Sequence, residues 1–175
     1  MRKAILLLST VAFIFLVSCS KDDPAPIVNE VTFDGEVYTT SGGLILDSGT
    51  QGGTHYNYNF YVTDGEISLN GNTLEISAST NFYVYASLVS VGPDSFTPGN
   101  FEYTTSFQLI DKNIFVAPVI YVRGESGFDS TLGTGGTITV SGSGPNYTVT
   151  YDITFGSKIL KGTYSGTFDI QDSPQ

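Results

Sequence analysis

Few side chains in this 175-residue chain are of the types that carry covalent or metal chemistry: it contains one cysteine, Cys19, and one histidine, His55. A Ser–His–acid triad would depend on His55, yet no Gly-x-Ser-x-Gly turn accompanies it. A zinc site needs several His or Cys ligands, which one histidine does not supply. No calcium-loop or phosphate-loop motif is present either, so we expect no cofactor and no metal. We expect His55 to begin a strand.

Carboxylates are the remaining catalytic option, because two of them can hydrolyse a glycosidic bond without His or Cys. Glu66, Glu75, Glu102 and Glu125 are candidates for such a pair. The sequence does not bring any two of them to the required separation. A carboxylate-dependent hydrolase of an extracellular polymer is therefore one alternative, and a non-catalytic protein is the main expectation.

The segment before Cys19 has the three parts of a secretory signal: basic Arg2-Lys3, an apolar run over residues 4–17, and the small residue Ser18. The run is shorter than the roughly 20 apolar residues of a membrane span. Leu16-Val17-Ser18-Cys19 resembles the bacterial lipobox. This resemblance implies that Cys19 receives a diacylglyceryl group, that the chain is cut before it, and that the new amine is acylated. Two or three acyl chains anchor a protein stably in a membrane.

The residues after Cys19 indicate a destination. Ser20-Lys21-Asp22-Asp23 resembles the short acidic export tag of Bacteroidota surface lipoproteins. The resemblance implies a lipid-anchored protein of the outer membrane, facing the cell surface. We expect a signal peptide over residues 1–18, a lipidated cysteine and flexible tether over 19–27, and one all-β domain over 28–171.

The net negative charge of the chain limits the kinds of partner that it can bind. The whole chain has a formal charge of −10, and loss of Arg2 and Lys3 with the signal peptide would make it −12. Nucleic acids and anionic lipid surfaces both require a basic face. We therefore expect no nucleic acid, and contact with the membrane through the lipid alone.

Alternation with a period of two dominates from about residue 28. In 147–155, Tyr147, Val149, Tyr151, Ile153 and Phe155 alternate with polar residues, which is typical of a strand with one buried face. Asp34-Gly35 and Gly156-Ser157 are typical of two-residue hairpin turns. The pattern predicts an antiparallel β-sandwich or closed β-barrel of about ten strands. The early hairpin and the closing strands resemble small β-domains of Bacteroidota lipoproteins, many of which have no assigned activity.

Three segments receive more specific predictions. Asp64-Gly65 and Asn70-Gly71 predict a tight meander over residues 56–78. The apolar run 114–122 predicts a strand buried on both sides, with Pro118 at an edge or a bulge. Residues 47–54, 91–100 and 124–136 read as long loops.

Tyr61, Tyr83 and Tyr85 alternate with core residues and therefore face away from the core. Outward aromatic rings stack on sugars or line a protein interface, unless a second layer covers them. We expect a non-catalytic binding or accessory protein for a glycan or an envelope protein. A lipocalin-like carrier of a small apolar ligand is a second alternative, which requires an open apolar interior.

Overall fold

The computed structural model describes residues 29–106 and 111–174, and all regular structure within these ranges is β-strand. The predicted all-β fold is confirmed. The described strands are β1 (Glu30–Phe33), β2 (Glu36–Thr39), β3 (Gly42–Gln51), β4 (His55–Thr63), β5 (Ile67–Asn70), β6 (Thr73–Ile76), β7 (Phe82–Val91), β8 (Gly99–Tyr103), β9 (Ile114–Gly124), β10 (Gly127–Leu132), β11 (Gly135–Ser143), β12 (Asn146–Phe155), β13 (Lys158–Thr167) and β14 (Asp169–Asp172).

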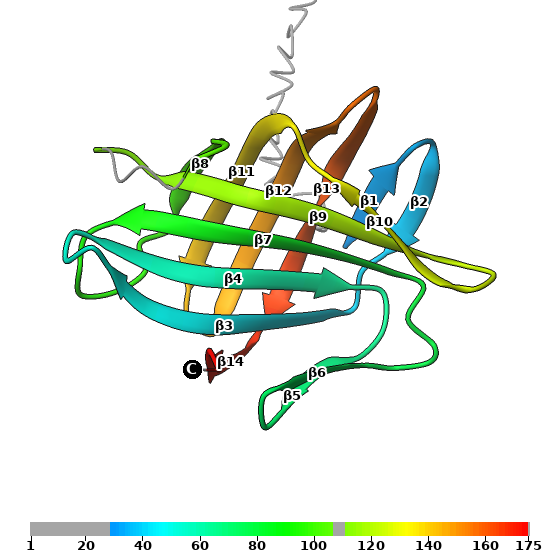
Figure 1. Cartoon of the computed structure of the whole chain (residues 1–175), viewed down its shortest axis with the longest axis horizontal. Coiled ribbons are helices and arrows are strands. Elements are labelled where there is room, and N and C mark those ends of the chain that lie inside the picture. Colours follow the sequence, from blue (N-terminus) through cyan, green and yellow to red (C-terminus); the bar gives the residue numbers. More distant parts are fainter. Residues whose placement is uncertain (1–28, 107–110, 175) are drawn as a thin grey trace, which may run out of the picture.

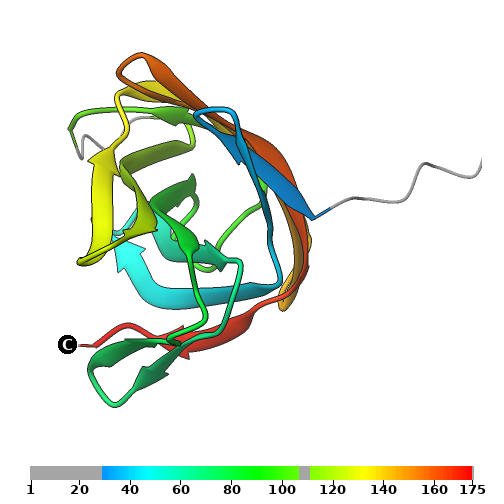
Figure 2. The same cartoon turned by 90° about the vertical axis from the view of Figure 1, so that its right-hand side faces the viewer.

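Twelve of these strands form one sheet, in the order β14-β3-β4-β7-β9-β8-β11-β12-β13-β1-β2, with β10 paired to β9. The sheet curls until β3, β4, β7 and β9 cross in front of β11, β12 and β13, as Figure 1 shows. The view at right angles shows the curl enclosing one interior (Figure 2). The fold is therefore a half-barrel with two facing layers, which agrees with the sandwich-or-barrel prediction.

Both corners of the half-barrel contain a parallel pairing, where purely antiparallel pairing was predicted. At one corner β8 runs parallel to β9 and antiparallel to β11. At the other, the predicted single last strand breaks at Phe168 into β13 and β14, and β14 runs parallel to β3. Gly43 of β3 makes this break possible, because a Cβ there would lie 2.6 Å from the Phe168 ring.

The core lies between the two layers and consists of the residues that the alternation selects. All five predicted core residues of β12 are buried, while Thr150 and Asp152 between them are exposed. Aromatic rings fill the interior. Phe60 lies within 6 Å of three other rings, with centroid distances of 5.5 Å to Phe96, 5.9 Å to Tyr147 and 5.3 Å to Phe168.

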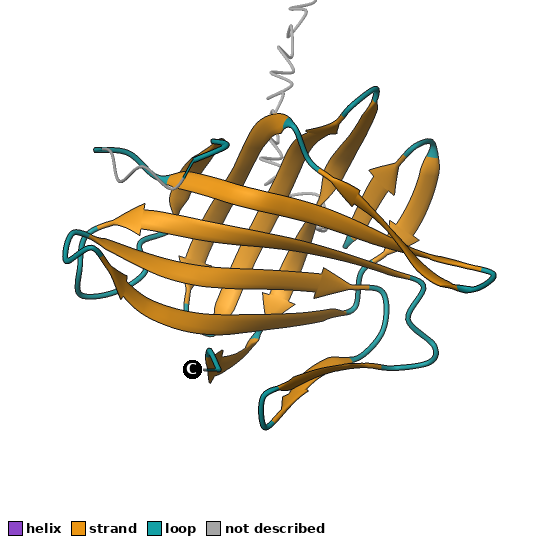
Figure 3. Ribbon diagram, viewed as in Figure 1, coloured by secondary structure: helices purple, strands orange, loops and turns teal. Residues whose placement is uncertain are grey.

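The two hairpin turns form as predicted. Asp34 and Gly35 adopt φ angles of 54° and 86° between β1 and β2, and Gly156 adopts 65° between β12 and β13. In the Asp34-Gly35 turn both central residues have positive φ, which matches the right-handed twist of the flanking strands and which Asp-Gly tolerates at low cost. Figure 3 shows how little of the described chain remains as loop between the strands.

Strand β9 has a bulge at Pro118, where an edge or a bulge was predicted. The predicted burial on both sides holds only for residues 114–116, because Ala117 is exposed and Val119, Tyr121 and Val122 are half-buried. The register against β7 shifts between Tyr85 and Ser87, opposite Ala117 and Pro118, and Ala117 has a φ of 46°. At the same point β9 exchanges its other neighbour, from β8 to β10. A proline without an N–H donor is tolerated there because the regular ladder is already interrupted.

Three local predictions are wrong. Residues 47–54 are not a long loop, because residues 47–51 belong to β3 and pair with β4, which leaves only residues 52–54 between the two strands. Residues 56–78 do not form a meander, because β4 pairs with β3 and β7 while β5 and β6 form a separate two-stranded sheet (Figure 1). Asp64 closes the base of that excursion, since its Oδ1 accepts the N–H groups of Asn81 and Phe82 at 2.9 Å each. The segment 124–136 is not a long loop, because it contains β10, paired to β9.

Candidate functional site

The three outward tyrosines of the prediction lie together on the outer side of β4 and β7. Tyr61 and Tyr85 are direct cross-strand partners, with ring centroids 5.0 Å apart and planes at 43°. Tyr83 lies two residues before Tyr85 on β7, on the same face of the strand. The alternation of residues predicted that the three tyrosines face outward, and the pairing register of β4 and β7 brings them together on one surface.

A fourth tyrosine completes the row. Tyr121 of β9 is the cross-strand partner of Tyr83, and their rings stack with centroids 4.3 Å apart and planes at 11°. Phe128 of β10 meets Tyr83 edge-on at 5.1 Å. We call Tyr61, Tyr83, Tyr85 and Tyr121 the tyrosine face. Sequence reasoning missed Tyr121, because the continuous apolar run 114–122 hides which of its residues point outward.

Exposure divides the tyrosine face into a base and a rim. Tyr83 is only 7% exposed, whereas Tyr61, Tyr85 and Tyr121 are half-buried. Each of the three rim residues therefore retains some solvent-accessible ring surface. A half-buried aromatic has lost much of its mobility before any ligand arrives, which lowers the entropic cost of binding.

Polar side chains beside the rim fix its orientation. The Tyr85 hydroxyl donates to Asn59 Oδ1 at 3.2 Å, and Asn59 Nδ2 donates to Ser48 Oγ at 2.9 Å. Two residues before Asn59 on β4, the buried side chain of Asn57 donates a hydrogen bond from Nδ2 to Ser87 Oγ at 2.8 Å. Asn57 and Ser87 are buried and belong to the scaffold, whereas half-buried Asn59 and Ser48 keep part of their surface beside the rim.

The phenols of Tyr61, Tyr83 and Tyr85 stay protonated at neutral pH. Burial raises the pKa of Tyr83 to about 12, and the neighbouring Tyr121 adds to that shift. Burial also raises the pKa of Tyr61 and of Tyr85 above the ordinary tyrosine value. Neutral phenols both donate and accept hydrogen bonds, and their rings present flat apolar faces. These groups can therefore stack on an apolar surface and hydrogen-bond to polar groups beside it.

The single histidine belongs to the scaffold. His55 begins β4, as predicted, is 3% exposed, and its Nδ1 lies 2.8 Å from Thr54 Oγ1. Among residues 29–106 and 111–174, no group of three His, Cys, Asp or Glu side chains is arranged to hold a metal ion.

The four candidate glutamates lie in three separate places. Glu66 and Glu75 line one shallow pocket on the β5–β6 hairpin, and both are exposed. Glu102 of β8 pairs with Lys112, and Glu125 is exposed in the turn between β9 and β10. The general acid of a glycosidase sits in a desolvated, apolar pocket, and solvent-exposed carboxylates on a hairpin lack such surroundings.

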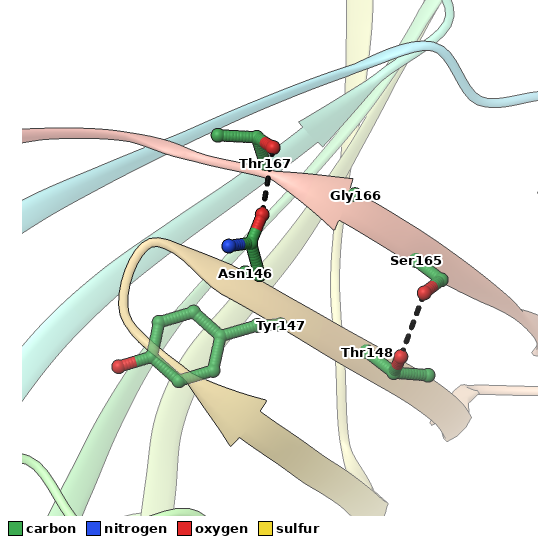
Figure 4. A pocket seen from close by; sticks show the side chains of 6 residues that line it. All are labelled: Asn146, Tyr147, Thr148, Ser165, Gly166 and Thr167. Carbon is green, nitrogen blue, oxygen red and sulfur yellow. Dashed lines mark hydrogen bonds between the residues drawn. The ribbon is translucent and has the colours of Figure 1, made fainter.

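A hollow over β12 and β13 is polar but already internally paired. Thr148 Oγ1 lies 2.8 Å from Ser165 Oγ, and Thr167 Oγ1 donates to Asn146 Oδ1 at 2.8 Å (Figure 4). Tyr147 lines the hollow too, but its ring lies on the other side of β12 in Figure 4 and is buried in the core. The hydroxyls of this hollow satisfy one another, which leaves the tyrosine face as the better candidate.

The interior bears on the carrier alternative. A lipocalin-like carrier needs an open apolar interior, whereas the space between the layers here is occupied by packed rings such as Phe60, Phe96 and Phe101.

Cys19 and the tether lie outside the described residues. Within the described ranges, no helix is long and apolar enough to cross a membrane. Comparisons with protein-family models, with curated proteins and with solved structures give no match.

Proposed function

We propose that this chain is a lipid-anchored outer-membrane protein whose β-domain binds a glycan or an envelope protein without catalysing a reaction. The anchor rests on Leu16-Val17-Ser18-Cys19, which resembles a lipobox, and on the acidic tag that follows. The acidity of the chain supports the same reading, because a formal charge of −10, or −12 once residues 1–18 are removed, keeps the domain away from anionic lipid headgroups.

The tyrosine face carries the binding half of the proposal. Four tyrosines from three neighbouring strands lie on one outward surface, and two direct ring contacts hold them in place. The curved strands supply a rigid platform, and aromatic rings contribute large contact areas at low entropic cost. The Tyr85 hydroxyl donates to Asn59, which leaves its oxygen lone pairs to accept a directional hydrogen bond from the same ligand.

Binding is tested with the purified protein on a glycan array and by capture of envelope proteins from native membranes. The double variant Tyr61→Ala and Tyr85→Ala should lose binding to the ligands that the unmodified protein retains. A control variant, Val37→Ala combined with Ile159→Ala, removes two exposed apolar side chains elsewhere and should bind normally. Unchanged binding by the tyrosine variant would refute the role of the face.

The anchor has its own test. Cys19→Ala should leave the protein unprocessed or release it from the membrane fraction, because the acyl chains have no other attachment point. Cys19→Ala protein that is still processed and fractionates with the outer membrane would contradict the lipid anchor. This outcome would not affect the tyrosine face, so the two halves of the proposal are tested separately.

A further inference from the structure

A groove of about 260 Å³ lies between the β1–β2 hairpin and the β9–β10 hairpin, where two free edges of the sheet approach each other. Among the described strands, β2 pairs only with β1, and β10 pairs only with β9. Figures 1 and 2 show both hairpins at the same end of the half-barrel. The groove is separate from the tyrosine face, because Val122 lines it from the opposite side of β9 to Tyr121.

The floor of the groove is aromatic and rooted in the core. Phe33 is 5% exposed and meets Phe155 edge-on at 5.5 Å. Tyr38 stacks on the buried ring of Phe82, with centroids 4.5 Å apart and planes at 19°. Both rings are therefore held in position from below while lining the groove.

The walls carry an excess of negative charge. Asp34, Glu36 and Asp129 line the groove with one basic residue, Lys158, which leaves two negative charges in excess. Tyr38 donates its hydroxyl proton to Glu36 Oε2 at 2.7 Å, which orients that carboxylate beside the ring.

Lys158 shows what this combination of groups recognises. Its Nζ lies 2.7 Å from Asp34 Oδ2 and 5.6 Å from the centroid of the Phe33 ring. A carboxylate next to an aromatic face is a favourable environment for an ammonium or guanidinium group. Glu36 repeats the combination with Tyr38, and Asp129 lines the same groove. No described cationic nitrogen lies within 4.0 Å of the Glu36 or the Asp129 carboxylate.

We propose that the groove binds a basic side chain, lysine or arginine, of a partner polypeptide. Charge complementarity selects a cation, since Glu36 and Asp129 supply the negative charges that Lys158 does not balance. The two free edges select a polypeptide, because unpaired backbone groups of β2 and β10 flank the groove and can pair with an extended chain. The volume accommodates one long side chain.

The test is a titration of the full-length protein with the pentapeptide acetyl-Thr-Thr-Lys-Thr-Thr-amide at low salt, followed by NMR. The Tyr38 and Thr131 resonances should shift, whereas those of the tyrosine face should not. Glu36→Gln combined with Asp129→Asn should weaken binding by about tenfold or more, because two charge-assisted partners are lost. An arginine peptide should behave similarly, and a norleucine peptide should not bind.

The matched control is Glu75→Gln combined with Glu125→Gln, which removes the same charge at two exposed positions outside the groove. This variant should bind the lysine peptide as the unmodified protein does. Equal weakening of both variants would reduce the effect to the overall charge of the domain and overturn the proposal. It would also be overturned by equal binding of the norleucine peptide, or by spermidine binding as tightly as the peptide.

Thermal melting of each variant shows whether it is folded before it is titrated. If the groove variant fails to fold, Tyr38→Phe provides a second test that keeps the ring and removes only the hydroxyl that orients Glu36. That variant should weaken the lysine peptide and leave the tyrosine face unaffected. Unaltered binding by a folded Tyr38→Phe protein would contradict the role assigned to the oriented carboxylate.

Discussion

The two sides of β4 and β7 both carry aromatic rings, yet the inner side is almost entirely apolar, whereas the outer side mixes its tyrosines with polar residues such as Asn57 and Asn59. On the inner side Phe60 and Phe82 are 1% and 0% exposed and contact rings from both layers. On the outer side Tyr61 and Tyr85 are half-buried and contact mainly each other. The difference teaches that inner rings provide stability, whereas outer rings retain surface for a ligand.

The largest effect on stability is expected from the inner side. Phe60→Ala should lower the free energy of unfolding by about 3–5 kcal/mol, because it leaves a cavity among three neighbouring rings. Urea unfolding measures the loss. A loss no larger than that of Tyr61→Ala would break the distinction between the two sides.

A smaller loss is expected where the inner side turns a corner. Gly43→Ala should cost about 1–3 kcal/mol, because the new methyl group overlaps the Phe168 ring. Gly135→Ala is the matched control, since its added Cβ would lie 3.9 Å from the nearest described atom. If the two variants unfold at the same urea concentration, Phe168 does not fix the corner.

The outer side should lose less stability and more binding. Tyr61→Ala should cost less than Phe60→Ala, because Tyr61 is only half-buried. The lost ring pair with Tyr85 contributes about 0.5–1.5 kcal/mol beyond the burial of the side chain. This variant should nevertheless weaken the retained ligand, because a rim ring has been removed. Calorimetric unfolding and ligand binding are measured on the same preparation. A variant that loses stability without losing binding would assign Tyr61 to the scaffold.

The smallest effect is a pH dependence. The folded pKa of Tyr83, about 12, lies above that of the unfolded chain, so the folded state disfavours the phenolate. The stability from Tyr83 is therefore fully present below about pH 10 and is lost as the pH rises toward 12. Ultraviolet titration of tyrosinate in the unmodified protein and in the Tyr83→Phe variant should differ by one phenol that ionises at high pH. Titration of all tyrosines at the ordinary pH would contradict a buried Tyr83.

Much of the fold was predictable because alternation and turn chemistry act over short distances. Period-two patterns identified the buried residues of β12, and Asp34-Gly35 identified the first hairpin. The parallel pairings of β8 and β14 were not predictable, because they depend on which distant strand lies alongside. The separation of β5 and β6 likewise depends on Asp64 bonding to residues 81 and 82.

The candidate site was predictable in part for the same reason. Alternation placed Tyr61, Tyr83 and Tyr85 outward, but only strand order adds Tyr121. The groove escaped prediction entirely, because its acids come from two hairpins that are nearly a hundred residues apart in sequence. The Cys19 anchor stays a prediction from the sequence, since that residue lies outside the described ranges.

The most direct test of the tyrosine face compares tyrosine oxidation by hydroxyl radicals on intact cells with that on the purified protein. If the face is covered by an envelope partner, Tyr61, Tyr85 and Tyr121 should be protected on cells and become reactive after purification. Tyr103, half-buried on β8 and outside the face, serves as the reference and should react equally in both samples. Equal reactivity of the three rim tyrosines in the two samples would contradict a bound partner at this face.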